Sequence, residues 1–263
     1  MQQQNQNIKL KSNWMIKMKI QNKLIFAVAT TVLAGAASAA QIDFRHEWKA
    51  DDYKEASRVK LGTGFNFENI DNLKANIGLE MKFKSFDQTK TLENTELSET
   101  ELDLGLTYKI GKWQIKPGMP IALTDRKRTF KPQIRIVYKS DFGLQTALRY
   151  RHEFANYSDP TDGDTNVETG NKVNRPTKSK ITLTGSYKID DLPNLKLSYE
   201  ANYVKSWDKV RQFDNKDWEY DAGIVVGYQF GDWRPFAEIW TVDESSSSSK
   251  RQARYRAGIK YKF

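Results

Sequence analysis

The alternation of apolar and charged residues along most of the chain constrains its fold more than any other feature. Leu102 and Leu104, for example, alternate with Glu101 and Asp103. Successive side chains of a strand point to opposite faces, so this pattern predicts strands with one apolar face and one charged face. No helical periodicity follows the first forty residues. The sequence therefore predicts an all-β protein.

Twelve segments of this kind follow one another from Gln41 to the end of the chain. They cover residues 42–49, 58–67, 73–84, 99–110, 113–123, 131–138, 142–154, 178–189, 195–204, 217–230, 233–241 and 254–263. Most are close to the roughly ten residues that a tilted membrane-spanning strand needs. The fifth segment is the least regular, because Pro117 and Pro120 cannot donate hydrogen bonds to a neighbouring strand.

The connections between these segments alternate in length. The short links are residues 111–112, 140–141, 190–194 and 231–232, and the longer polar ones are 50–57, 85–98, 124–130, 155–177, 205–216 and 242–253. Outer-membrane barrels have short periplasmic turns, longer outer loops and an even number of strands. A soluble β-sandwich also shows alternation. The loop pattern and the terminal Phe263 favour a transmembrane up-and-down antiparallel β-barrel of about 12 strands.

The N-terminal residues have the layout of an export signal. Three lysines between positions 17 and 23 precede the apolar run 24–37, and small residues follow at positions 37–40. This is the pattern of a secretory signal peptide, and the run is too short for a membrane-spanning helix. We expect residues 1–40 to be an N-terminal extension and signal peptide, with the signal proper at 18–40. Translation would start at Met1 or Met18, and cleavage would follow Ala39 or Ala40. Residues 41–263 would form a single outer-membrane barrel domain.

The charge of the chain depends on this segment. The formal net charge is +9, and residues 1–40 contain five lysines and no acidic residue, which leaves +4 for the rest. Such a mildly basic protein is not expected to bind nucleic acid. The chain has no cysteine, so an exported form cannot be stabilised by disulfides.

One short motif, aromatic-Arg-His-Glu-aromatic, occurs twice, at residues 44–48 and 150–154. The alternation places Arg45 and Arg151 on the inward face of their strands. The first and seventh strands of a closed twelve-stranded barrel lie on opposite walls, so these arginines would face each other across the lumen. His46 and His152 would lie on the outward face, where packing at the membrane interface is the expected role.

The same alternation predicts two basic tracks in the lumen. One comprises Arg45, Arg58, Lys60, Arg254 and Arg256, and the other comprises Arg135, Arg149, Arg151 and Lys180. Acidic walls are expected between them, from Glu99, Glu101 and Asp103 and from Asp217, Glu219 and Asp221. Arginine binds carboxylates through two parallel hydrogen bonds and stays charged, and a channel needs many weak contacts of this kind. These nine residues are therefore predicted to bind an anionic substrate. The alternative is that they only pair with the acids and fill the lumen.

The sequence contains no pattern that identifies a catalytic centre. No serine with a plausible general base, no metal-ligand cluster and no cofactor motif emerges, so we predict a protein that is not an enzyme and needs no cofactor. Two alternatives from other classes remain open. An outer-membrane barrel enzyme, such as a lipase or protease, would make His46 the residue to test. A structural or adhesive barrel would have a plugged lumen and would not conduct.

Several short motifs resemble the oligogalacturonate-specific porin family, which also contains a sialic acid channel. The motifs lie at residues 42–47, 113, 116–118, 131–135, 148–152 and 256–263, and the resemblance spans essentially all of residues 41–263. It implies a monomeric twelve-stranded channel in outer-membrane lipid, with arginine tracks that guide acidic oligosaccharides from pectin breakdown. Glu99, Glu101 and Asp103 depart from this pattern, so a sialic acid channel or another anionic-sugar porin is the alternative substrate assignment.

Overall fold

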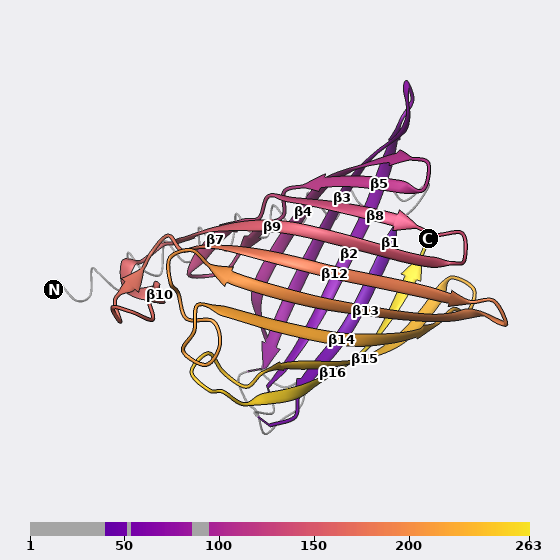
Figure 1. Cartoon of the computed structure of the whole chain (residues 1–263). Helices are drawn as coiled ribbons and strands as arrows, with labels where there is room; N and C mark the ends of the chain where they lie inside the picture. The colour runs from indigo at the N-terminus through magenta and orange to yellow at the C-terminus, as the bar shows by residue number, and fades with distance from the viewer. Residues whose placement is uncertain (1–39, 52–53, 86–94) are drawn as a thin grey trace.

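The computed structural model describes residues 40–51, 54–85 and 95–263, which consist mainly of β-strands (Figure 1). The strands are β1 (Gln41–Lys49), β2 (Glu55–Phe67), β3 (Ile70–Ser85), β4 (Thr95–Ile110), β5 (Trp113–Gly118), β6 (Ile121–Leu123), β7 (Lys127–Phe130), β8 (Gln133–Lys139), β9 (Leu144–Tyr157), β10 (Asp164–Thr165), β11 (Lys172–Val173), β12 (Thr177–Ile189), β13 (Leu192–Ser206), β14 (Trp218–Tyr228), β15 (Trp233–Asp243) and β16 (Arg251–Lys262). A short 3-10 helix, η1 (Pro160–Asp162), precedes β10. In the described residues, no helix has the length and apolar character needed to cross a membrane. The predicted signal peptide lies outside them, apart from Ala40.

The long strands form one closed antiparallel barrel. Neighbouring strands pair in chain order, the first strand pairs with the last (β1 with β16), and β9 pairs with β12. The sheet has fourteen strands. β5 and β6 together occupy one position in the barrel wall, and β7 and β8 together occupy another, so the wall has twelve strand positions. The predicted twelve-stranded antiparallel barrel is confirmed. Its period-two pattern holds because closure gives every strand one side toward membrane lipid and one toward the lumen.

Two of the twelve strand positions in the wall are interrupted at prolines. Pro120 separates β5 from β6, and Pro132 separates β7 from β8. Their carbonyl groups still accept hydrogen bonds, from Lys131 at 2.9 Å and from His152 at 3.0 Å, so the wall stays continuous. The predicted loop at residues 124–130 is wrong in its second half, because β7 pairs with both β6 and β9. The charged residues at the start of β7 resemble a polar loop in the sequence, so the sequence did not predict this strand.

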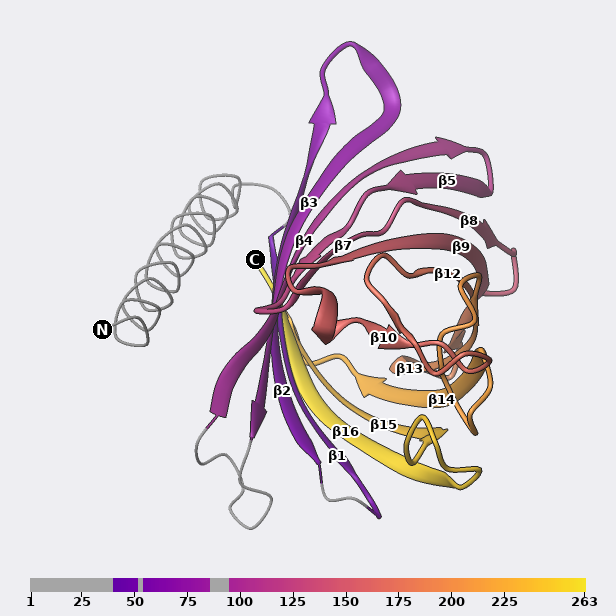
Figure 2. The same cartoon turned by 90° about the vertical axis from the view of Figure 1, so that its left-hand side faces the viewer.

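The two rims of the barrel differ. The turn rim carries the short connections and both ends of the described barrel, where Phe263 donates its N–H to the carbonyl of Ala40 at 2.9 Å. The outer rim carries the long connections 158–176, 207–217 and 244–250. Figure 2 looks onto the outer rim, with β10 between β9 and β14. This asymmetry matches the periplasmic and external sides of an outer-membrane barrel.

The two faces of the wall differ in polarity as the alternation predicts. Outward side chains are large and apolar, and Leu148 and Ile224 are 55% and 57% exposed. The charged side chains of Asp43, Glu153 and Arg256 are buried inside the barrel. A lumen lined by charged groups suits polar solutes, so the lumen is the candidate functional site.

Candidate functional site

A cavity of about 1020 Å³ occupies the lumen and is lined from all sides of the barrel. Its described lining contains 14 Lys and Arg residues and 7 Asp and Glu residues, an excess of seven positive charges. The structure places all nine predicted track residues along this cavity: Arg45, Arg58, Lys60, Arg135, Arg149, Arg151, Lys180, Arg254 and Arg256. Their contacts, however, differ greatly between the two sides of the lumen.

On the side formed by β15, β16, β1 and β2, carboxylates lie within ion-pair distance of most of the cations. Arg256 lies in register between Glu47 of β1 and Glu238 of β15. Its Nε donates to Glu47 at 2.7 Å, and its Nη1 donates to Glu238 at 3.2 Å. Arg45 pairs with Asp43 at 2.9 Å. Carboxylates of the wall itself therefore neutralise both arginines, from the two neighbouring strands for Arg256 and from the same strand for Arg45.

The pairing continues into β2. Arg58 forms an ion pair with Glu80 at 3.0 Å, and Lys60 pairs with Asp103 at 3.2 Å. Arg254 lies over the ring of Trp240, 5.0 Å from its centroid, and is the exception on this side: it forms no ion pair among the described residues, and its Nε is buried without a hydrogen-bond partner. We call this side, with Arg45, Arg58, Lys60, Arg254 and Arg256, the paired wall. The predicted separation of basic tracks from acidic walls is wrong here, because acids on the same strand and on neighbouring strands lie among the cations.

The opposite side, around β5, β8, β9 and β12, differs in the partners of its cations. Lys116, Arg135 and Arg149 are direct partners on three neighbouring strands, so three cations lie side by side. The Nη2 of Arg149 donates to the Thr182 hydroxyl at 2.9 Å, and Arg135 donates to the Thr184 hydroxyl. These partners are neutral. The Nε of Arg149 is buried and has no hydrogen-bond partner.

Arg151 and Lys180 extend this cluster and are direct partners between β9 and β12. Arg151 donates to the Gln133 side-chain oxygen at 2.9 Å and lies 3.8 Å from a carboxylate oxygen of Glu153. Within the described part of the chain, Lys116, Arg135, Arg149 and Lys180 form no ion pair. We call Lys116, Arg135, Arg149, Arg151 and Lys180 the open wall. The alternation did not place Lys116 in a basic track, because it precedes Pro117 in the least regular segment.

The predicted acidic residues only partly line the lumen. Glu99, Glu101, Asp103 and Asp221 line the cavity, and Glu101 binds Lys131 at 2.6 Å. Asp217 does not line it: this residue precedes β14 at the outer rim and pairs with Lys205 at 2.7 Å. Glu219 is also absent from the cavity lining as described. The acidic wall expected from residues 217–221 therefore reduces to Asp221.

Both histidines lie among the outward aromatic side chains. His46 Nδ1 is 3.0 Å from the Ser57 hydroxyl, and its ring stacks on Trp48 with centroids 5.9 Å apart. His152 makes the same contact with Ser179 at 3.0 Å, and its ring centroid is 4.5 Å from that of Phe154. Neither histidine lines the lumen cavity. The repeated motif thus repeats a contact on the membrane face as well as an inward arginine.

Replacing His46 or His152 by glutamine should leave conductance and anion selectivity unchanged, because glutamine keeps a polar contact to the serine and neither ring reaches the lumen. Single-channel recording of each variant in planar bilayers measures this. Heat-modifiable migration on gels verifies that the variant is folded. A folded variant with altered conductance would mean that the inward and outward faces of these strands are assigned the wrong way round.

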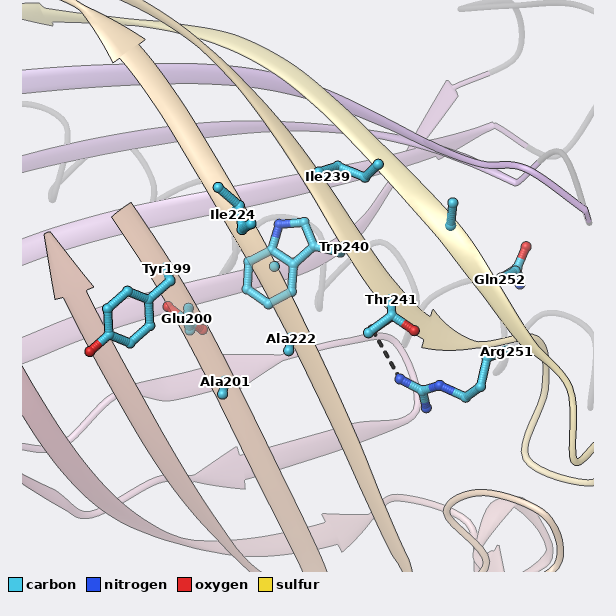
Figure 3. A pocket seen from close by; sticks show the side chains of 12 residues that line it. Tyr199, Glu200, Ala201, Ala222, Ile224, Ile239, Trp240, Thr241, Arg251 and Gln252 are labelled. Carbon is cyan, nitrogen blue, oxygen red and sulfur yellow. Dashed lines mark hydrogen bonds between the residues drawn. The ribbon is translucent and has the colours of Figure 1, made fainter. Parts of the chain in front are cut away.

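A second cavity, of about 560 Å³, lies at β13 to β16 (Figure 3). Four small residues form a continuous row of register partners across these strands: Ala201, Ala222, Thr241 and Ala253. Ile224 and Ile239 flank the row, and Arg251 donates to the Thr241 carbonyl at 2.9 Å (Figure 3). The outward alternation of these residues turns the row toward the membrane, so it adds nothing to the polar pathway.

Comparison with known proteins agrees with this architecture. A family model described as oligogalacturonate-specific porin protein (KdgM) matches residues 33–263. The oligogalacturonate-specific porin KdgM of Dickeya dadantii (strain 3937) is 26% identical over 244 residues, which cover 92% of this chain and 99% of that protein. An uncharacterized protein, YiiY, of Salmonella typhimurium (strain LT2) is 26% identical over 251 residues, or 93% of this chain and 99% of that one.

Solved structures share the fold. The NanC porin has a TM-score of 0.63 at 15% identity, with 84% of this chain and 100% of that chain covered. The KdgM porin has a TM-score of 0.59 at 20% identity, with 85% and 99% covered. The family match extends over the whole barrel and the polar lumen suits a channel. This chain therefore belongs to the oligogalacturonate-specific porin family and is a channel of the outer membrane.

Proposed function

We propose that this porin lets acidic oligosaccharides, with oligogalacturonates as the main class, diffuse across the outer membrane, and that the open wall binds their carboxylates. One observation carries the proposal: Lys116, Arg135 and Arg149 lie side by side without an ion pair in the described residues. The relative named an oligogalacturonate-specific porin supports the substrate class. A structure titled as the KdgM porin in complex with disordered oligogalacturonate supports it as well.

The two walls have different tasks in this mechanism. Guanidinium groups on the open wall now donate to hydroxyls, and a sugar carboxylate can replace those neutral partners with a stronger, charge-assisted hydrogen bond. On the paired wall, carboxylates already pair with every cation except Arg254, and their negative charge disfavours a second anion nearby. The substrate therefore moves along the open wall, passing between several weak contacts. Transport requires each contact to be weak enough for release.

We also propose that the protein is a monomeric, non-catalytic channel in outer-membrane lipid, from which residues 1–40 are removed on export. The barrel closes on its own strands, so no second copy is needed to complete the lumen. Ser57 and Ser179 stand beside histidines, but they lie in paired strands. The backbone N–H groups there are committed to the sheet, whereas an acyl-transfer site needs free donors for its oxyanion.

Recording in planar bilayers tests the proposal directly. Trigalacturonate should block the open channel in a concentration-dependent manner, and uncharged maltotriose at the same concentrations should block it far less. Sialic acid serves as the competing acidic ligand, and a tighter block by sialic acid than by trigalacturonate would change the substrate assignment. A purified barrel that does not conduct, or that responds equally to charged and neutral sugars, would contradict the proposal.

A further inference from the structure

We propose that the outer rim holds a second, separate site for an acidic sugar, which captures the substrate before it enters the lumen. A cavity of about 410 Å³ lies between the strand ends and loops of this rim. The residues that matter in its lining are Arg126, Lys127, Asp164, Thr165, Lys172 and Arg211. No residue of this cavity also lines the lumen cavity as described. The inference rests on the proposed transport function and adds an entry step to it.

Hydrogen bonds between loops build this site. The 158–176 connection pairs with the 207–217 connection through an antiparallel bridge between Asn166 and Val210. On either side of the bridge, the backbone N–H of Val167 donates to the Lys209 carbonyl at 2.8 Å. The backbone N–H of Arg211 donates to the Thr165 carbonyl at 2.9 Å. In Figure 2 this part of the chain lies between β9 and β14, over the barrel mouth.

Two further connections join the same network. The N–H of Ser158 donates to the Arg126 carbonyl at 2.8 Å, which attaches residues 124–126. The backbone N–H of Asn215 donates to the Ser246 carbonyl at 3.0 Å, which attaches residues 244–250. Four connections thus hold one another in place. A site held in this way loses less conformational entropy on binding than one formed by separate loops.

The charges of the site favour an anion. Four cationic side chains line it, namely Arg126, Lys127, Lys172 and Arg211, against the two carboxylates of Asp162 and Asp164. Asp164 already accepts a hydrogen bond from the Tyr157 hydroxyl at 2.6 Å, and Lys127 donates to the same hydroxyl at 3.0 Å. Asp164 is thereby occupied by an internal contact, and the cavity keeps an excess of two positive charges.

Lys172 and Arg211 carry the proposed contacts to the anion, beside Arg126, which also lines the cavity. The Lys172 ammonium donates to the Thr165 hydroxyl at 3.3 Å, and the Nε of Arg211 is buried without a hydrogen-bond partner. Neither residue forms an ion pair with any part of the chain that the structure describes. A carboxylate placed between them would receive charge-assisted hydrogen bonds from both.

The hydroxyl groups around these cations specify the rest of the ligand. Thr165 and Ser246 line the same cavity, and a hydroxyl can both donate and accept a hydrogen bond, whereas the Thr124 hydroxyl is already bonded within its own turn. The Thr165 and Ser246 hydroxyls match a ring that carries several hydroxyl groups beside one carboxylate, which is the chemistry of a uronic acid. An inorganic anion would use the cations and leave the hydroxyls without ligand partners.

The test compares block by trigalacturonate added to each side of a planar bilayer. In the Lys172→Gln/Arg211→Gln variant, the half-blocking concentration from the outer-rim side should rise about threefold, while block from the turn-rim side and open-channel conductance stay unchanged. The chain has no cysteine, so a thiol label on Ser247→Cys identifies the outer side. The control is Lys216→Gln/Lys250→Gln, which removes the same charge at the same rim outside the cavity.

Three results would overturn the entry site: an equal loss of block from both sides, the same loss in the control, or no change from the outer side. Arg211→Lys keeps the charge and should restore most of the block. Lys172→Gln alone tests the site if the double variant does not fold, because its exposed ammonium contacts only a hydroxyl among the described residues. A wild-type channel that trigalacturonate blocks from neither side would instead contradict the proposed transport function.

Discussion

Replacing Arg135 and Arg149 together by serine should raise the half-blocking concentration of trigalacturonate by about tenfold or more. A hydrogen bond to a charged group contributes about 1.5–3 kcal/mol, and about 1.4 kcal/mol corresponds to tenfold in affinity. Both arginines donate to threonine hydroxyls, so the substitution leaves no carboxylate unpaired. The open channel should also become less anion-selective, as measured from its reversal potential in a salt gradient.

The matched control lies on the paired wall. Arg58→Ser combined with Glu80→Gln removes an ion pair of 3.0 Å and leaves the net charge of the lumen unchanged. Its block and selectivity should stay close to wild type, although it widens the lumen as well. The effect of the Arg135 and Arg149 substitutions should shrink at high salt, because the Debye length falls from about 10 Å at 0.1 M to about 3 Å at 1 M. If the Arg135 and Arg149 substitutions leave the block by trigalacturonate unchanged at low salt, the open wall has only a structural role.

The face of the barrel on which each side chain lies could be predicted from the sequence. Period-two alternation decides this, because a shift of one residue would turn every side chain to the opposite face. Arg45 and Arg151 accordingly line the lumen, whereas His46 and His152 do not. Strand ends were less certain where alternation fails, as at Pro120 and in β7, whose charged residues resembled a loop.

The partners that charged groups find on neighbouring strands could not be predicted, because they depend on register between strands. Arg256 and Arg149 look alike in sequence, since both alternate with apolar residues and neither has an acid two residues away. In the structure, Arg256 lies between Glu47 and Glu238, whereas Arg149 lies opposite Thr182. Strand stagger in a barrel sets such pairings, and Glu238 reaches Arg256 only through the register of β15 with β16. The division into paired and open walls therefore appears only in three dimensions.

The division into paired and open walls predicts a second large effect, in which trigalacturonate binds more tightly instead of more weakly. Glu238→Gln should increase anion selectivity and lower the half-blocking concentration of trigalacturonate about fivefold. Glu238 accepts from Arg256 at 3.2 Å and lies 3.9 Å from Arg45. Glutamine still accepts from the Trp240 indole N–H, now 2.7 Å from Glu238. Loss of one negative charge near the pathway is worth on the order of 1 kcal/mol for a nearby anion.

The variant should remain folded, because Arg256 keeps its ion pair with Glu47 at 2.7 Å and Arg45 keeps Asp43 at 2.9 Å. Glu244→Gln at the outer rim is the charge-matched control and should bind trigalacturonate as wild type does. Tighter binding should also lengthen each blocking event, because release from the lumen becomes slower. The acids of the paired wall would then serve to keep substrate affinity low enough for transit. A Glu238→Gln channel that binds no more tightly would mean that the charges of the paired wall do not reach the substrate.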